Sequence, residues 1–193
     1  GKIINEKNES VIKNQLGFLL DGDYYYPELT LKQMKNIFSP AYSNWDEEVF
    51  CKLIERFDLP LNQKIINLSK GMKMKFSLAL ALSHHAEILI MDEPTSGLDP
   101  LVRSELLDIL KELKEQGISV LFSTHITSDL EKIADNIILI NKGKVLFQEE
   151  METLKASHFI VKAKISSLNS ENKKLFLKIT ENNNMFEGIC KGE

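Results

Sequence analysis

The chain has few of the residues that cross-link small proteins or build metal cages. Its 193 residues include only two cysteines, Cys51 and Cys190, which lie far apart and outside any Cys-x-x-Cys pair. This pattern excludes a disulfide framework and a cysteine-based zinc motif. It favours a reducing compartment, in which free thiols persist.

Long hydrophobic runs are also missing from the sequence. The longest run, 76–82, is interrupted by Ser77, whereas a helix needs about 20 apolar residues to span a bilayer. No signal-peptide pattern opens the chain. Gly1 rather than Met stands first, which leaves open that the gene begins further upstream.

The chain has no excess of positive charge. It contains 24 Lys and Arg against 28 Asp and Glu, which gives a net charge of −4 and a pI of about 5.7. Because a basic footprint is absent, we expect no nucleic-acid partner. Hydrophobic residues make up 43% and charged residues 27%, so the composition is that of a globular protein with one sizeable core.

Short apolar runs alternate with helical patterns from Glu87 onward. The expected strands are 88–91, 118–122 and 136–140, and the expected helices between them are 101–116 and 128–134. Apolar strands separated by helices are typical of an α/β fold with a largely parallel sheet. We also expect a strand at 16–20 and, from Asn141-Lys142-Gly143, a hairpin that joins 136–140 to 144–147.

The region from Tyr24 to His85 has no such strands and is expected to be a helical insertion. Thr30, Asp46 and Ser69 are suitable N-caps for the helices that follow them. The pattern weakens after Glu149. We expect a strand at 158–165 and no regular structure in 170–193, because that segment is rich in Asn, Lys and Glu.

Two carboxylates follow the expected strand 88–91. In open α/β sheets, ligands bind at the carboxyl ends of the strands, and Asp92 and Glu93 occupy that place. Asp92 fits a magnesium-holding acid, and Glu93 fits a group that polarises an attacking water. Taken alone, the pair equally fits a turn that opens before Pro94.

Four motifs in series point beyond these two residues. LSKGM (68–72) resembles a signature motif usually written LSGGQ, ILIMDE (88–93) a Walker B segment, SGLD (96–99) a D-loop, and STH (123–125) a switch-histidine segment. The chain therefore resembles, over about 16–149, the nucleotide-binding domain of ABC-type ATPases. Its LSKGMKMK segment, the Asp at the Q-loop position and the modest tail together resemble the bacterial exporters of the YtrB or bacitracin-resistance type. The resemblance implies a P-loop NTPase-like (RecA-like) parallel sheet with a helical signature subdomain, truncated at the N-terminus.

The resemblance implies an ATP and Mg²⁺ site. Asp92 would hold the magnesium ion, Glu93 would position the attacking water, and His125 would contact the phosphate. Ser69, Lys70 and Gly71 would meet the γ-phosphate held by another subunit, because a helix begins there and its free N–H groups attract anions. Gly71 would let the backbone approach the phosphate closely.

Asp99 and Asp21 are two further acids that the resemblance assigns. Asp99 would cross the dimer interface as the D-loop acid, and it also fits an N-cap before Pro100. Asp21 stands where the family has the glutamine of its Q-loop. An aspartate there can hold Mg²⁺ directly or through water, but it is shorter and charged, which puts the usual coupling geometry in doubt.

Aromatic and histidine pairs near these motifs have two interpretations each. Tyr24, Tyr25 and Tyr26 either pack or help to form a docking groove for a membrane partner, which the family's Q-loop and helical insertion face. His84 and His85 have no acidic or cysteine partners at ligand spacing, so we expect them to be structural rather than metal-binding.

The phosphate-binding loop, GxxxxGK[ST], is missing from the 193 residues. Lys2 is followed by Ile and Lys144 by Val, so neither Gly-Lys pair qualifies. Residues 1–4 resemble the strand that follows this loop in the family. We therefore expect a chain truncated at its front, which is inactive alone.

The resemblance implies the ATP-hydrolysing subunit of an ABC transporter. Its partners would be a second ATPase subunit, as homo- or heterodimer, and a separate permease, at the cytoplasmic face of a bacterial membrane. The expected domains are a core (1–23 and 86–148), a helical subdomain (24–85) and a C-terminal extension (149–193). The alternative is a non-catalytic regulatory or docking module of the same fold. A DNA-repair or ribosomal relative is disfavoured, because the chain has no coiled-coil insertion or second such domain and is acidic.

Overall fold

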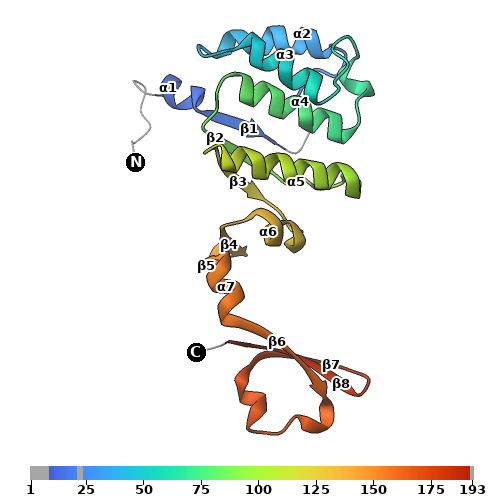
Figure 1. The fold of residues 1–193 in the computed structure, drawn as a ribbon, viewed down its shortest axis with the longest axis vertical. Coiled ribbons are helices and arrows are strands. Elements are labelled where there is room, and N and C mark those ends of the chain that lie inside the picture. The colour runs from blue at the N-terminus through green and yellow to red at the C-terminus, as the bar shows by residue number, and fades with distance from the viewer. Residues whose placement is uncertain (1–8, 21–23, 192–193) are drawn as a thin grey trace. The chain divides into compact units, whose positions relative to one another are not determined.

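The computed structural model describes residues 9–20 and 24–191, which form two compact units, 1–129 and 130–193 (Figure 1). In the first unit the elements are α1 (Glu9–Asn14), β1 (Leu16–Leu19), α2 (Leu31–Phe38), α3 (Glu47–Arg56), α4 (Lys70–Ser83), β2 (Ile88–Asp92), α5 (Pro100–Glu115) and β3 (Ser119–Ser123), with short 3-10 helices at Ser39–Ala41 and Ile65–Asn67. Helix α6 (Thr127–Ile133) begins in this unit. The expected strands and helices of this part are confirmed to within a few residues.

The first unit contains a parallel sheet in the order β1-β2-β3, which confirms the expected α/β class. Its register aligns Leu19 with Met91, and Asp92 with Ser123. Leu19, Leu89 and Met91 are buried. The parallel register brings the carboxyl ends of β2 and β3 together, and this is where the site forms.

Helix α4 packs closely on strand β1. A Cβ added to Gly17 would lie 2.7 Å from both the Ala81 Cβ and a Leu89 methyl, so only glycine allows this approach. The apolar half of α4 is buried, and Phe76 and Leu78 have no exposed surface. Helix α4 is therefore the central core element of the first unit, with α3 packed against it as well.

The expected N-caps are confirmed. The Thr30 side chain accepts from the Gln33 N–H in a capping box, and Asp46 accepts from the amides of Glu48 and Val49. Ser69 Oγ accepts from the Met72 N–H at the start of α4. Each cap satisfies N–H groups that a helix start leaves without a partner, so local sequence determines where these helices begin.

The second unit consists of a hairpin, a helix and a small antiparallel sheet. Its elements are β4 (Asn136–Asn141), β5 (Lys144–Glu150), α7 (Met151–Ser157), β6 (His158–Lys164), β7 (Phe176–Asn182) and β8 (Met185–Lys191), with 3-10 helices at Ile165–Ser167 and Asn172–Leu175. Strands β4 and β5 pair antiparallel, as expected from the turn at Gly143. In the described part of the chain β4 pairs with β5 alone.

The expectation of no regular structure in 170–193 is wrong. Strands β7 and β8 pair antiparallel, and β8 also pairs with β6. The rings of Phe176 and Phe186 meet edge to face with centroids 5.4 Å apart, and Phe186 is buried. Asn183 takes a left-handed conformation (φ 51°) at the tip of the hairpin, which asparagine tolerates well. A few alternating apolar residues thus outweigh the polar composition.

The division into units falls between residues 129 and 130. The sequence had placed the boundary of the ATPase core at 148. The difference concerns the hairpin β4–β5, which the structure groups with the residues that follow it.

Candidate functional site

The site begins where β2 and β3 end side by side. Ser123, the last residue of β3, donates a hydrogen bond from Oγ to Asp92 Oδ1 at 2.6 Å. The same Oγ accepts the backbone N–H of Glu93 at 3.0 Å. One hydroxyl therefore fixes the orientation of the Asp92 carboxylate and the path of the chain at Glu93.

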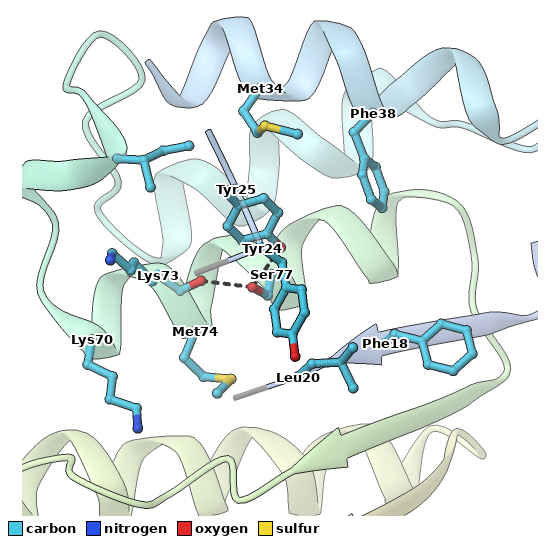
Figure 2. A pocket seen from close by; sticks show the side chains of 11 residues that line it. Phe18, Leu20, Tyr24, Tyr25, Met34, Phe38, Lys70, Lys73, Met74 and Ser77 are labelled. Atoms are coloured by element: carbon cyan, nitrogen blue, oxygen red, sulfur yellow. Dashed lines mark hydrogen bonds between the residues drawn. The ribbon is translucent and has the colours of Figure 1, made fainter. Parts of the chain in front are cut away.

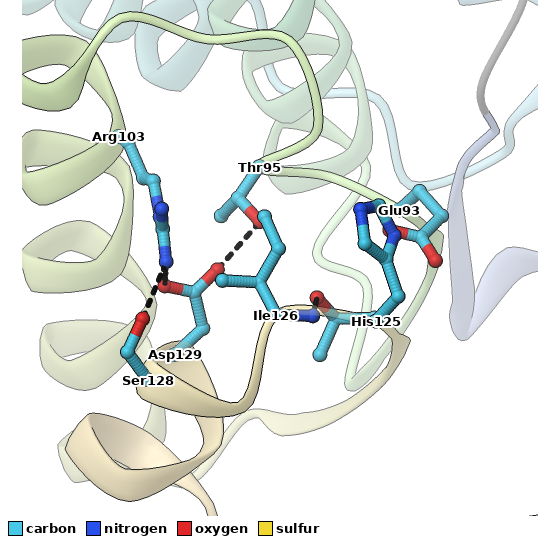
Figure 3. A network of polar contacts seen from close by, with 8 residues as sticks. Glu93, Thr95, Arg103, His125, Ile126, Ser128 and Asp129 are labelled. Carbon is cyan, nitrogen blue, oxygen red and sulfur yellow. Dashed lines mark hydrogen bonds and ion pairs between the residues drawn. The ribbon is translucent and has the colours of Figure 1, made fainter. Parts of the chain in front are cut away.

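Glu93 and His125 face each other across this edge. Glu93 Oε2 lies 2.8 Å from His125 Nδ1, and the two side chains are 27% and 70% exposed (Figure 3). Glu93 has a left-handed backbone conformation with φ 45°, which costs of order 1–3 kcal/mol for a non-glycine residue and is concentrated at functional sites. The structure thus brings together both residues to which the sequence assigned catalysis.

Asp92 remains exposed and can reach a ligand. In the described residues no cluster of three or more His, Cys, Asp or Glu side chains is arranged to hold a metal ion. Mg²⁺ keeps several waters in proteins and takes one or two carboxylates together with substrate phosphates. Asp21, the other expected magnesium ligand, lies outside the described residues.

The signature segment stands at the start of α4. Ser69 and Lys70 are exposed, whereas Gly71 is buried. A Cβ on Gly71 would meet a Val102 methyl at 2.6 Å, so Gly71 has a packing role against α5 besides the phosphate contact expected for it. A Cβ on Gly97 would lie 3.7 Å from Lys70 Cδ and Nζ, which places the Lys70 side chain beside the SGLD segment.

Asp99 is the N-cap of α5. Its Oδ1 accepts the N–H groups of Leu101 and Val102, both at 3.1 Å, and Pro100 is the first residue of the helix. The capping interpretation is confirmed. The interpretation of Asp99 as a group that crosses a dimer interface stays a prediction, and the two are compatible because its side chain is exposed.

One polar network at this edge was missed by the sequence analysis. Asp129 is completely buried and binds both Thr95 and Arg103 (Figure 3). These residues carry no recognisable motif, and an Asp in the first turn of a helix usually faces solvent. Only the three-dimensional contact identifies them.

The three tyrosines differ from one another. Tyr25 is half-buried, its hydroxyl shares a hydrogen bond with Ser77 Oγ at 2.8 Å, and its ring meets Phe76 edge to face. Burial raises the pKa of Tyr25 above its ordinary value. Tyr24 and Tyr26 are 64% and 63% exposed. The packing interpretation therefore applies to Tyr25, and its two neighbours offer more surface to a partner.

Tyr24 and Tyr25 line a pocket of about 510 Å³ (Figure 2). Its other lining residues are Phe18, Leu20, Met34, Phe38, Ile65, Lys70, Lys73, Met74 and Ser77. The walls come from β1, α2 and the first turns of α4 and are mostly apolar.

His84 is buried at the end of α4. Its Nδ1 lies 3.1 Å from the Asn14 carbonyl oxygen, and its ring stacks on Tyr42 with centroids 3.8 Å apart. Burial lowers the pKa of His84 below its usual 6.5. His85 is exposed, with Nε2 3.4 Å from Asp46 Oδ2. His84 thus packs in the first unit as a core side chain.

The fold and this edge define a class of protein, the P-loop NTPase-like domains. A solved structure titled "Structure of ATP binding subunit of ABC transporter" matches with a TM-score of 0.67 and 28% identity, over 78% of this chain and 65% of that one. A second, the protein cbiO1 from Clostridium perfringens, matches at 0.65 with 23% identity and shows the same fold. The expected fold class is confirmed.

The particular family follows from sequence comparison. The family model described as "AAA domain, putative AbiEii toxin, Type IV TA system" matches residues 30–128, slightly more than half of the chain. The chain belongs to this family of AAA domains.

The proteins of similar sequence include ATP-binding proteins of transporters. The chain is 30% identical to the ABC transporter ATP-binding protein NatA of Bacillus subtilis over 154 residues, 77% of this chain and 63% of that protein. It is 31% identical to the bacitracin transport ATP-binding protein BcrA of Bacillus licheniformis over 152 residues, 77% of this chain and 50% of that protein. The resemblance to ABC transporter ATP-binding proteins is confirmed, including its bacitracin branch.

The chain spans only part of these relatives, about half of BcrA and 63% of NatA. No helix in the described residues is both long and apolar enough to cross a membrane.

Proposed function

We propose that this chain supplies the signature, Walker B, D-loop and switch-histidine parts of the ATP site of an ABC transporter. The observation that carries the proposal is the Glu93–His125 pair, with 2.8 Å between Oε2 and Nδ1, beside the Asp92 carboxylate that Ser123 orients. The family and the relatives support nucleotide binding and ATPase activity in general.

In this proposal Glu93 orients the attacking water and accepts its proton, as a general base at the end of a buried strand. His125 holds the Glu93 carboxylate in place and reaches the phosphate from the next strand. Asp92 would hold Mg²⁺, which supplies positive charge that neutralises the phosphate oxygens. Glu93 combines a left-handed backbone conformation with the contact between its carboxylate and His125.

The signature residues and Asp99 act on a second subunit, whereas Asp21 acts within its own. Ser69, Lys70 and Gly71 would contact the γ-phosphate bound by the partner chain, and Asp99 would cross the interface. Asp21 would stand in for the Q-loop glutamine. A solved structure of related fold is a dimer of the ATP-binding cassette MJ0796 in a post-hydrolysis state, bound to ADP and phosphate. A homo- or heterodimer that sandwiches ATP is the arrangement proposed for this chain.

The expected domain division is part of the same proposal. Residues 1–23 and 86–148 would form the ATPase core, 24–85 the helical subdomain and 149–193 the C-terminal extension. The helices α2, α3 and α4, without intervening strands, support the helical subdomain.

The hydrolytic role is tested by phosphate release. The purified 193 residues should release no phosphate from Mg-ATP, because they contain no GxxxxGK[ST] sequence. The same chain joined to a segment that carries this sequence should hydrolyse ATP. In that longer chain Glu93→Gln should slow turnover by about 10²–10⁴-fold and leave ATP binding intact.

Two results would count against this role. Mg-dependent release by the 193 residues alone would refute the need for the missing loop, and unchanged turnover of Glu93→Gln would remove Glu93 from the reaction. The alternative, a non-catalytic module, predicts that the complete gene also lacks the loop. Sequencing the gene upstream of Gly1 separates the two.

We further propose that the chain docks to a transmembrane permease at the cytoplasmic face of a bacterial membrane, through the exposed Tyr24 and Tyr26. Both tyrosines are more than 60% exposed beside the apolar pocket. Replacing both by Ala should reduce co-purification of the permease and leave basal hydrolysis in the longer chain unchanged. Tyr25→Phe is the matched control, because that side chain is half-buried and its hydroxyl is bonded to Ser77, and it should co-purify normally. Loss of hydrolysis with intact co-purification would contradict docking.

A further inference from the structure

One fully buried carboxylate in the first unit belongs to none of the four motifs. Asp129 (0% exposed) lies in α6, four residues after His125. A buried carboxylate is costly to desolvate and persists only when its oxygens are well paired. Both oxygens of Asp129 are paired, and both partners come from outside α6.

The two partners of Asp129 lie between β2 and the first turn of α5. Thr95 Oγ1 donates to Asp129 Oδ2 at 2.6 Å, and Arg103 Nε donates to Oδ1 at 2.8 Å. A second nitrogen of Arg103 donates to the same oxygen and, at 2.8 Å, to Ser128 Oγ (Figure 3). Thr95 is 1% exposed, so the contact between its hydroxyl and the carboxylate is shielded from water. Charge-assisted hydrogen bonds of this kind are strong and directional.

The hydrogen bonds among Asp129, Thr95 and Arg103 fix the chain on one side of the Glu93–His125 pair. The hydrogen bonds of Ser123 fix it on the other side. Along one segment, Glu93 lies between Asp92, which Ser123 binds, and Thr95, which Asp129 binds. Along the other segment, His125 lies between Ser123 and Asp129. Each loop is therefore fixed on both sides of its catalytic residue.

The chain between His125 and Asp129 is itself fixed. Asp129 N donates to the Ile126 carbonyl oxygen at 3.1 Å, and Ile126 N donates to Thr124 Oγ1 at 3.0 Å. Arg103 N donates to the Asp99 carbonyl oxygen at 2.9 Å, so the network also reaches the SGLD segment. A displacement at Asp129 is thus transmitted through short, bonded segments.

We propose that Asp129 is a positioning residue that, through Thr95 and Arg103, fixes the loop bearing Glu93 against the loop bearing His125. Its meaning for hydrolysis rests on the proposed function, because that proposal gives Glu93 and His125 their roles. The positioning itself is a property of the folded chain and is measurable without nucleotide.

The test uses Thr95→Val, which keeps the shape of the side chain and removes the hydroxyl. In the 193-residue protein, nuclear Overhauser contacts between the His125 ring and the Glu93 methylenes should be present in the wild type and lost in Thr95→Val. Amide exchange at Glu93 and Ile126 should accelerate by about 10–100-fold, the factor that corresponds to one hydrogen bond to a charged group. Exchange at Leu80, within the buried half of α4, should not change.

Two further variants separate positioning from general destabilisation. Thr95→Ser restores the hydroxyl and should restore both readouts. Thr127→Val makes the same change at an exposed threonine of the same region and should alter neither. The proposal is overturned if Thr95→Val keeps the His125–Glu93 contacts, if exchange rises equally at Leu80, or if Thr127→Val has the same effect. Absence of ATPase activity in the longer chain that carries the GxxxxGK[ST] segment would refute the proposed function and leave this outcome unaffected.

Discussion

The core around α4 and the loops of the site are built from different interactions, although both belong to the first unit. In α4 the apolar side chains are almost fully buried, with Phe76 and Leu78 at 0% exposure. At the site, the His125 side chain is 70% exposed and is held by hydrogen bonds. Apolar burial therefore supplies stability, whereas directed polar contacts supply the geometry of the site. Thr95 and Asp129 combine the two properties, because both are polar, buried and hydrogen-bonded to each other.

Among the predicted changes, the largest loss of stability is expected from a substitution in the core around α4. Phe76→Ala removes a fully buried ring that also contacts Tyr25, and it should lower the free energy of unfolding by about 3–5 kcal/mol because a cavity remains. Urea denaturation followed by circular dichroism measures this loss. If the variant does not fold, Phe76→Leu should still show a measurable loss.

The matched control for Phe76→Ala lies in the site. His125→Ala truncates an exposed side chain, so the free energy of unfolding should change by no more than about 0.5 kcal/mol. A loss comparable with that of Phe76→Ala would show that the site also carries the stability of the unit, and the comparison would fail.

A smaller loss of stability is expected when the pH is lowered, because one titratable side chain of the core, His84, is buried. Burial holds the pKa of His84 below 6.5 in the folded protein, so the unfolded chain binds the proton more readily. Stability should be complete above pH 6.5 and fall as the pH drops from 6.5 toward the folded pKa, by at most about 1.4 kcal/mol per pH unit. Urea midpoints between pH 7.5 and 5 measure this slope.

Two histidine variants identify the source of the slope. His84→Gln should reduce it, because the buried imidazole is gone. His85→Gln should retain it, since His85 is exposed next to His84. An identical slope in wild type and His84→Gln would assign the acid sensitivity to other groups.

Most of the first unit was predictable because its signals are local. Helix starts at Thr30, Asp46, Ser69 and Asp99 depend on a side chain that caps its own helix, so the sequence identifies them directly. Strands β1, β2 and β3 are short apolar runs bounded by polar residues. The hairpin β7–β8 was missed, because its pairing depends on the contact between Phe176 and Phe186 rather than on composition.

The sequence predicted which residues form the site better than it predicted which atoms they contact. Asp92, Glu93 and His125 follow strands whose ends must meet at one edge of a parallel sheet, so their proximity follows from topology. The role of Ser123 as a hydrogen-bond partner of both Asp92 and Glu93 was not foreseen. The identity of the hydrogen-bonding atoms depends on side-chain positions about 30 residues apart in the chain, which no local pattern encodes.

The sequence alone determined the family, the α/β class, the helix starts and the acids at the end of β2, because these depend on motifs and on neighbours along the chain. The tertiary structure decided that the Tyr25 hydroxyl bonds Ser77 while Tyr24 and Tyr26 are exposed, that Gly71 packs against Val102, and that Asp129 binds Thr95 and Arg103. These features arise where segments that are distant in sequence pack against one another and exclude water. Because Asp129 is buried and both its oxygens are hydrogen-bonded, its carboxylate keeps one position between the loops that bear Glu93 and His125.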